Sequence, residues 1–209
     1  MDIRKRIYFV LGGPGSGKGT FCKNMVTKNP NLFAHLSAGD LLRKFNKNHD
    51  PINSPDKDKE RFKIIDNCIK EGSIVPAEIT IGLILDEISV NEMNCFLIDG
   101  FPRNQGNYDG WVKLSQERDN IETSKLLYLD CSEDTMLARI NKRASESKVK
   151  RVDDNIEAFR KRIKVFLGET MPIVNIFDSQ GKCVKIDSEK TQEDMYQQIK
   201  DIGLFKNLN

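Results

Sequence analysis

A glycine-rich loop directly after a run of apolar residues constrains the fold of this chain most. Residues 7–11 (IYFVL) are followed by Gly12-Gly13-Pro14-Gly15-Ser16-Gly17-Lys18-Gly19-Thr20. The loop has the spacing G-x-x-x-x-G-K, with Gly12, Gly17 and Lys18 in register. Glycines let the backbone turn its N–H groups inward around phosphate oxygens, and the start of a helix adds its positive dipole end. The pattern predicts a phosphate-binding loop between a buried strand and a helix, in which Lys18 supplies a charge for the β- and γ-phosphates.

One position departs from the general pattern of such loops. Gly19 stands where a serine or threonine usually follows the lysine, and Thr20 comes one residue later. The hydroxyl that usually ligates magnesium is therefore absent or displaced. A glycine-rich turn without a ligand is the alternative interpretation, but the lysine and both flanking elements favour phosphate binding.

Strand-like and helix-like segments alternate along the rest of the chain. Further apolar runs lie at residues 34–36, 95–98, 125–129 and 183–186, and helical spacing links Phe21 to Met25 and Ile156 to Phe166. A last helix is predicted to begin near Thr191. Nearly continuous apolar strands are typical of a parallel sheet covered on both faces, so we expect an α/β fold of the P-loop NTPase type. Two polar segments, residues 46–60 and 144–154, are expected to be surface excursions.

Composition excludes several other classes of protein. The 209 residues suit a single domain, and 33 Lys+Arg against 31 Asp+Glu give a net charge of +2. A general nucleic-acid-binding protein would carry a larger basic excess. No apolar run is long enough for a membrane span or a signal-peptide core, so we expect an intracellular protein without membrane partners. The five cysteines are scattered, which predicts neither a disulfide framework nor a zinc site.

Several segments resemble motifs of the nucleoside monophosphate kinases. They are the loop in its G-x-P-G-x-G-K-G-T form, Ser37-Ala38-Gly39-Asp40-Leu41-Leu42-Arg43, Glu71-Gly72 with Val75-Pro76 and Ile79-Thr80, Asp99-Gly100-Phe101-Pro102-Arg103-Asn104-Gln105, and Arg151-Val152-Asp153-Asp154-Asn155. Arg162 also lies where this family carries an arginine. The match runs from about residue 7 to 207, and within this adenylate kinase-like family the chain most resembles UMP-CMP kinases.

The resemblance implies one kinase domain over residues 1–209, with an insertion for the acceptor monophosphate at about 37–76 and a short lid at about 142–154. The implied reaction moves the γ-phosphoryl group of ATP, with Mg²⁺, to UMP, CMP or dCMP. The implied catalytic residues are Lys18, Asp99, Arg103, Arg151 and Arg162. ATP would bind to Gly13, Pro14, Gly15, Ser16, Gly17, Lys18, Gly19, Thr20 and Arg143. The acceptor would bind to Ser37, Ala38, Gly39, Arg43, Ile74, Val75, Thr80, Gly100, Phe101, Arg103 and Asn104.

The implied lid and metal residues have their own roles. Asp99 would orient magnesium through water, because magnesium dehydrates reluctantly. Arg151 would clamp the transferring group, and Asp153 and Asp154 would pair with the arginines or cap the next helix. Arg143 and Arg151 are eight positions apart where the family has six, and Lys150 replaces a glycine. The resemblance therefore predicts the contacts of this lid less closely than the contacts of the other motifs.

Ala38 and Asn104 predict which base the acceptor carries. Short-lid adenylate kinases have threonine in place of Ala38, and the Asn104 carboxamide can pair with uracil or cytosine. Adenylate kinase remains the first alternative because few residues separate the two activities. A catalytically silent nucleotide-binding module and a nucleic-acid-binding protein are weaker alternatives. The resemblance further implies a monomer that works in pyrimidine nucleotide synthesis in the cytoplasm, with the nucleus as an additional location.

Overall fold

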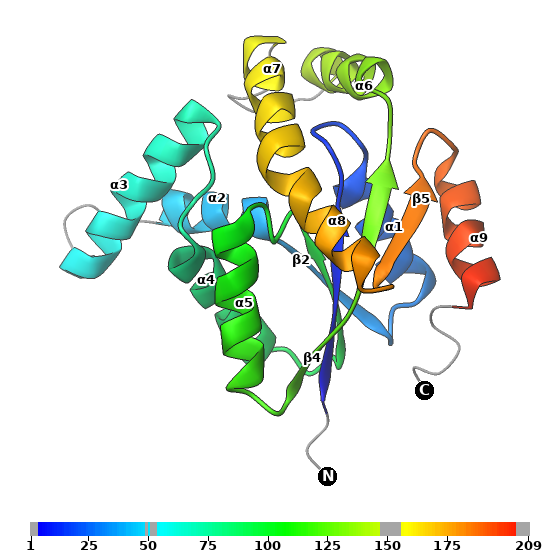
Figure 1. Cartoon of the computed structure of the whole chain (residues 1–209). Coiled ribbons are helices and arrows are strands. Elements are labelled where there is room, and N and C mark those ends of the chain that lie inside the picture. Colours follow the sequence, from blue (N-terminus) through cyan, green and yellow to red (C-terminus); the bar gives the residue numbers. More distant parts are fainter. Residues whose placement is uncertain (1–3, 49, 51–53, 147–155, 204–209) are drawn as a thin grey trace.

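The computed structural model describes residues 4–48, 50, 54–146 and 156–203. It contains five strands, whose bounds are β1 (Lys5–Leu11), β2 (Phe33–Ser37), β3 (Cys95–Asp99), β4 (Ile121–Asp130) and β5 (Cys183–Asp187). All four strand pairings are parallel, and the order in the sheet is β2-β3-β1-β4-β5. This architecture confirms the predicted α/β fold with a parallel sheet (Figure 1).

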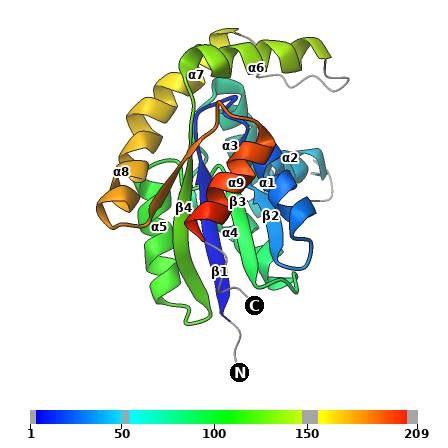
Figure 2. The ribbon, with the colours of Figure 1, turned by 90° about the vertical axis from the view of Figure 1, so that its right-hand side faces the viewer.

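Helices cover both faces of the sheet, as Figures 1 and 2 show. Their bounds are α1 (Lys18–Lys28), α2 (Ala38–Asn48), α3 (Asp56–Glu71), α4 (Ala77–Ser89), α5 (Gln105–Gln116), α6 (Glu133–Glu146), α7 (Ile156–Val165), the π-helical segment η1 (Phe166–Thr170), α8 (Met171–Ser179) and α9 (Gln192–Ile202). Helices α1 and α9 lie on one face of the sheet, and α4, α5 and α8 lie on the other. None of the helices in these described residues is long and apolar enough to cross a membrane.

Alternation along β1 divides the hydrophobic core in two. Phe9 faces Phe101, Trp111 and Phe177 on the side of α5 and α8. Tyr8 and Val10, on either side of Phe9 in the sequence, instead pack against α1 and α9. Successive side chains of a strand point to opposite faces, so a strand buried on both faces must be apolar throughout. The central strand thereby holds the glycine-rich loop at one end of a rigid core.

The segment after β2 has a small core of its own. One buried cluster contains Leu42 of α2, Ile65 of α3, Val75 of the loop before α4, and Ile79 of α4. In α3 only Ile65 is buried, and the other side chains of this helix are at least partly exposed. The predicted acceptor insertion therefore contains α2, α3 and the loop that leads to α4.

Two local expectations hold only in part. In the predicted surface excursion at 46–60, residues 46–48 belong to α2 and residues 56–60 to α3, which begins at Asp56 after its N-cap Pro55. Charged side chains at helical spacing can stay in water while the backbone forms a helix, and Lys59 pairs with Asp56 in this way. The helix predicted around Ile156 to Phe166 changes to a π-helical turn at Phe166, and Ile156 is 51% exposed rather than packed.

Candidate active site

The loop between β1 and α1 adopts the conformation that its glycines predict. Gly15 and Gly17 have φ angles of 86° and 90°, in the left-handed region where a side chain is disfavoured. A Cβ atom at Gly15 would also collide with the backbone oxygen of Met136. Gly17 is the N-cap of α1, so the loop leads directly into the positive end of that helix.

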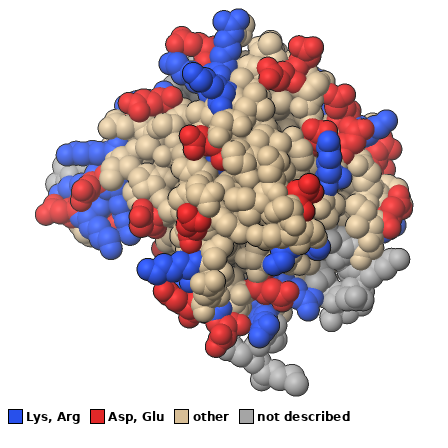
Figure 3. Space-filling model, in the orientation of Figure 1, with Lys and Arg blue, Asp and Glu red and all other residues tan. Residues whose placement is uncertain are grey.

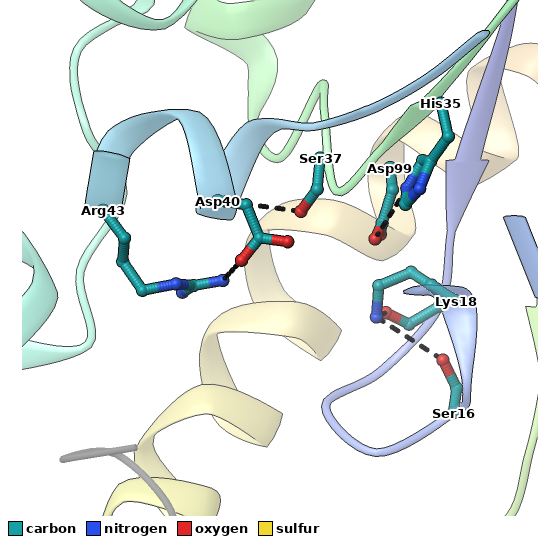
Figure 4. Close-up of polar contacts among 8 residues, drawn as sticks. Ser16, Lys18, His35, Ser37, Asp40, Arg43 and Asp99 are labelled. Carbon is teal, nitrogen blue, oxygen red and sulfur yellow. Dashed lines mark hydrogen bonds and ion pairs between the residues drawn. The ribbon is translucent and has the colours of Figure 1, made fainter. Parts of the chain in front are cut away.

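Lys18 folds back over this loop. Its Nζ donates hydrogen bonds to the carbonyl oxygens of Gly12 (2.8 Å) and Gly13 (2.9 Å) and lies 3.5 Å from Ser16 Oγ (Figure 4). The pKa of Lys18 is lowered to about 8, chiefly by burial; the nearby Asp99 carboxylate opposes this shift, and the Arg103 charge adds to it. An anion at the loop would restore the preference for the charged ammonium.

Asp99 ends β3 next to the phosphate loop and is 8% exposed. Its Oδ2 lies 3.7 Å from Nε2 of His35, which comes from the neighbouring strand β2, and the two side chains point toward one another in Figure 4. A Cβ at Gly19 would lie 3.6 Å from the same oxygen. Gly19 therefore leaves space between the loop and the carboxylate.

This arrangement fits magnesium held largely by water and phosphate. Among the described residues, no group of three or more His, Cys, Asp or Glu side chains could form a metal cage. Magnesium commonly uses one or two carboxylates together with substrate phosphates and water. Asp99 is a single buried carboxylate beside the phosphate loop, and the Thr20 side chain lines the same cavity.

A cavity of about 660 Å³ extends from the phosphate loop to α2, α6 and α7. Its cationic lining includes Lys18, Arg43, Arg103, Arg139, Arg143 and Arg162, and its acidic lining residues are Asp40 and Asp99. Further predicted residues in its wall are Pro14, Gly15, Gly17, Gly19, Thr20, Ser37, Gly39, Ile74 and Gly100. A cavity with this excess of fixed positive charge suits a polyphosphate.

A second, smaller cavity of about 80 Å³ adjoins the first, with Arg43, Arg103 and Arg162 in both walls. Its lining also includes Ala38, Val75, Thr80 and Asn107. Arg43 pairs with Asp40 at 2.5 Å at the rim, where both side chains are exposed to water. A narrow space beside three arginines suits a flat ring attached to a monophosphate.

The comparisons with known proteins agree with this geometry. The model of the adenylate kinase family matches residues 10–182, which is most of the chain. The chain belongs to the adenylate kinase family. It is 42% identical to UMP-CMP kinase 3 of Oryza sativa subsp. japonica over 201 residues, covering 96% of this chain and 87% of the relative. It is 41% identical to uridylate kinase of Saccharomyces cerevisiae over 198 residues, covering 93% and 89%. It is 40% identical to UMP-CMP kinase of Homo sapiens over 205 residues, covering 96% and 97%.

Membership of this family confirms the predicted nucleoside monophosphate kinase, but two predicted acceptor residues lie elsewhere. Phe101 is fully buried in the core, with its ring 5.8 Å from that of Trp111. Asn104 is the N-cap of α5, where its Oδ1 accepts a hydrogen bond from the backbone N–H of Asn107 at 2.8 Å. Neither residue lines the two cavities described above. An aromatic residue beside a strand end packs inward, and an asparagine before a helix caps it.

Other predicted residues support the site without lining it. Ser16, a residue of the loop itself, is fully buried. Gly13 lies against the Met136 side chain, and its carbonyl oxygen accepts a hydrogen bond from Lys18 Nζ. The lid residues Arg151, Asp153 and Asp154 lie outside the described residues, as does the lid from residue 147 onward. Arg143, at the start of the lid, is in α6 and lines the large cavity.

Sequence reasoning missed several lining residues, among them Arg139, Asn107 and Thr170. Arg139 lies one helical turn before Arg143 and donates to the carbonyl oxygens of Ser188 (2.8 Å) and Ser16 (3.4 Å). Asn107 is 3% exposed and lines the small cavity. Thr170 is 5% exposed and lines the large one. Helical spacing from Arg143 could have indicated Arg139, whereas the other two become visible only when distant segments are brought together.

Proposed function

We propose that this protein transfers the γ-phosphoryl group of ATP to UMP or CMP, and also to dCMP. The observation that supports this function most directly is one cationic cavity that joins the phosphate loop to a narrow pocket containing Asn107. The names of the relatives, UMP-CMP kinase and uridylate kinase, support the same acceptors. Adenylate kinase activity is the alternative within the family.

Different residues of the cavity would bind the donor phosphates, the acceptor phosphate and the group in transfer. The loop backbone and Lys18 bind the donor phosphates, and Arg43 and Arg103 bind the acceptor phosphate through forked hydrogen bonds. Arg162 lines both cavities and is therefore suited to the group in transfer. Phosphoryl transfer needs positioning and charge stabilisation more than covalent participation, so arginines can supply most of what it requires.

Asp99 would hold the hydrated magnesium beside the phosphate loop. The metal, when bound, neutralises charge on the donor phosphates. The arginines and Lys18, which line the same cavity, would stabilise the remaining negative charge. No side chain needs to act as a strong base, because the acceptor phosphate is itself anionic.

The Asn107 carboxamide is suited to a pyrimidine ring. Its Oδ1 accepts a hydrogen bond from the backbone N–H of Arg103 at 3.2 Å, and this oxygen retains a second lone pair. The amide group can donate to O4 of uracil or to N3 of cytosine, while the second lone pair can accept from the adjoining N–H of either base. Asn107 thus takes the base-recognition role that the sequence suggested for Asn104.

Two segments are proposed to close over the nucleotides. In the acceptor insertion at about 37–76, Leu42, Ile65 and Val75 form a cluster that is completed by Ile79 of α4 and is separate from the core under the sheet, which would let the insertion move. The lid at about 142–154, with Arg151, Asp153 and Asp154, would cover the donor phosphates by resemblance to the family. Closure would exclude water that otherwise hydrolyses ATP.

The remaining parts of the proposal rest on the family resemblance. They are a monomeric state, a cytoplasmic location with the nucleus as an additional one, and a place in pyrimidine nucleotide synthesis. On the face shown in Figure 3, Lys and Arg side chains lie among Asp and Glu side chains. That mixture favours small nucleotides over a nucleic acid as the anionic ligand.

A direct assay tests this function. ADP formation from ATP and magnesium is measured with UMP, CMP, dCMP, AMP and GMP as separate acceptors. We expect fast turnover with UMP and CMP and little with AMP. AMP as the best acceptor would establish the adenylate kinase alternative, and no turnover with any acceptor would favour a silent nucleotide-binding module.

A further inference from the structure

The main chain of Arg103 is held from two sides. Its N–H donates to Asn107 Oδ1 at 3.2 Å, and its carbonyl oxygen accepts a hydrogen bond from Thr170 Oγ1 at 2.6 Å. The side chain is also tied locally, since Nε donates to the carbonyl oxygen of Gly100 at 2.6 Å. These contacts leave the guanidinium end of Arg103 in the wall shared by both cavities.

Thr170 reaches Arg103 from a distant part of the chain. It is the last residue of η1, the π-helical segment between α7 and α8, and it lies 67 residues from its partner in sequence. The π-helical geometry appears in the Met171 N–H, which bonds to the carbonyl oxygen of Phe166, five residues earlier. Single π-helical turns often occur at functional sites.

Thr170 is buried and lines the nucleotide cavity. Thr170 is 5% exposed, and Arg103 O is the partner its hydroxyl has in the structure. A buried hydroxyl or carbonyl that loses its hydrogen bond costs free energy, so neither group easily gives up the contact. The bond therefore links the Gly100–Arg103 turn to the continuous helical segment that also carries Arg162.

We propose that Thr170 is a positioning residue for phosphoryl transfer. Its hydroxyl fixes the backbone of Arg103 and so aims the guanidinium at the acceptor phosphate, and this role rests on the proposed function of the same site. The donor nucleotide is bound by the glycine-rich loop and Lys18, which Thr170 does not contact. Loss of the hydroxyl should therefore weaken use of the acceptor and leave use of ATP nearly unchanged.

Three variants separate positioning from packing. Thr170→Val keeps the shape of the side chain but removes the hydroxyl, and Thr170→Ser keeps the hydroxyl but removes the methyl group. Thr27→Val is the matched control, because Thr27 Oγ1 also donates to a carbonyl oxygen, that of Lys23, on the exposed side of α1. Steady-state assays give KM and kcat for ATP and for the acceptor that the wild type uses best, at temperatures below the unfolding transition of each variant.

We expect Thr170→Val to raise the acceptor KM about tenfold and to lower kcat, with the KM for ATP changed by less than about twofold. Thr170→Ser and Thr27→Val should both remain within about twofold of the wild type. Binding of the acceptor alone, measured by calorimetry, should weaken in the valine variant by a similar factor.

Other results would overturn the proposal. An unchanged acceptor KM in Thr170→Val would show that Arg103 is aimed without the hydroxyl. Equal rises in the KM of ATP and of the acceptor, or a serine variant as impaired as the valine variant, would indicate a packing role alone. The acceptor assay on the wild type distinguishes failure of this proposal from failure of the proposed function. If the wild type prefers AMP, pyrimidine specificity is refuted, and the effect of Thr170→Val on the acceptor KM is then measured with AMP.

Discussion

Lys18 carries its charge in surroundings that disfavour it. Burial lowers its pKa to about 8, so the empty protein gives up part of this proton just above neutral pH. A bound triphosphate would favour the charged form and raise the pKa again. Through Lys18, binding of ATP should therefore take up a substantial fraction of a proton per site at pH 8.5 and almost none at pH 6.5.

Calorimetry in two buffers of different ionisation enthalpy measures this proton uptake. Lys18→Arg is the control, because a guanidinium stays protonated throughout this pH range. Uptake at pH 8.5 should disappear in the arginine variant. The same uptake in both proteins would assign the titrating group elsewhere.

Asn107 offers a second test at the scale of one residue. Asn107→Asp keeps an oxygen for the backbone N–H of Arg103 but replaces the amide donor with an acceptor. Uracil O4 and cytosine N3 would then each face a carboxylate oxygen instead of a donor, while the N–H that pairs with Oδ1 keeps its acceptor. We expect kcat/KM to fall about 100-fold with both UMP and CMP.

The matched control for this variant is Asn104→Asp. Asn104 caps α5, and an aspartate can make the same cap, so acceptor preference should not change. A loss of kcat/KM with both pyrimidine acceptors in Asn104→Asp but not in Asn107→Asp would return base recognition to Asn104.

These two asparagines show what sequence could and could not predict about the site. The phosphate loop and Asp99 were predictable because their chemistry depends on short, contiguous patterns. Asn104 and Asn107 are three residues apart on the same motif, and only the start of α5 decides which one caps the helix and which one faces the cavity. Thr170 could not be predicted, since its partner lies 67 residues away in sequence.

At the scale of elements, the strands follow closely from the sequence. Apolar runs such as that of β1 predict burial on both faces, and the structure places each of them in the parallel sheet. The polar α3 was missed because charged residues dominate it and only Ile65 is fully buried, while Ile64, Cys68 and Ile69 pack beside it only partly buried. The π-helical turn at η1 was missed because local sequence patterns scarcely distinguish it from an α-helix.

Helix α9 allows a test of how much an N-terminal capping motif stabilises its helix. Thr191 and Asp194 form a capping box, in which Thr191 Oγ1 accepts from the Asp194 N–H and the Asp194 side chain accepts from the Thr191 N–H. Thr191→Ala should lower the free energy of unfolding by about 1 kcal/mol, measured by urea denaturation. The control Thr27→Ala removes a hydroxyl inside α1 and should have a smaller effect.

The same box makes a prediction about pH. Hydrogen bonds from Thr191 lower the pKa of Asp194, so its contribution to stability is present above the ordinary aspartate pKa and disappears as pH falls through the lowered value. The difference between wild type and Thr191→Ala should shrink between about pH 4 and pH 2. A constant difference over this range would mean that the Asp194 carboxylate does not contribute to the cap.

At the scale of the whole molecule, the parallel sheet brings the chemistry to one edge. The carboxyl ends of β1, β2 and β3 carry the phosphate loop, Ser37 and Asp99, and ligands of open α/β sheets bind at such an edge. Helices α6 and α7 add arginines from above this edge. A chain with a net charge of only +2 can therefore concentrate positive charge where phosphates bind.

Closure of the molecule is the last expected consequence of this layout. The arginines that line the large cavity come from α2, the turn after β3, α6 and α7. Two joined nucleotides would therefore draw these elements together. An adenosine–uridine analogue linked through phosphates should reduce the radius of gyration measured by small-angle X-ray scattering. ATP alone should give a smaller change, and a diadenosine analogue should require a higher concentration, because its second base is too large for the pocket at Asn107. Saturation by the adenosine–uridine analogue, established by calorimetry, without any compaction would contradict a closing mechanism.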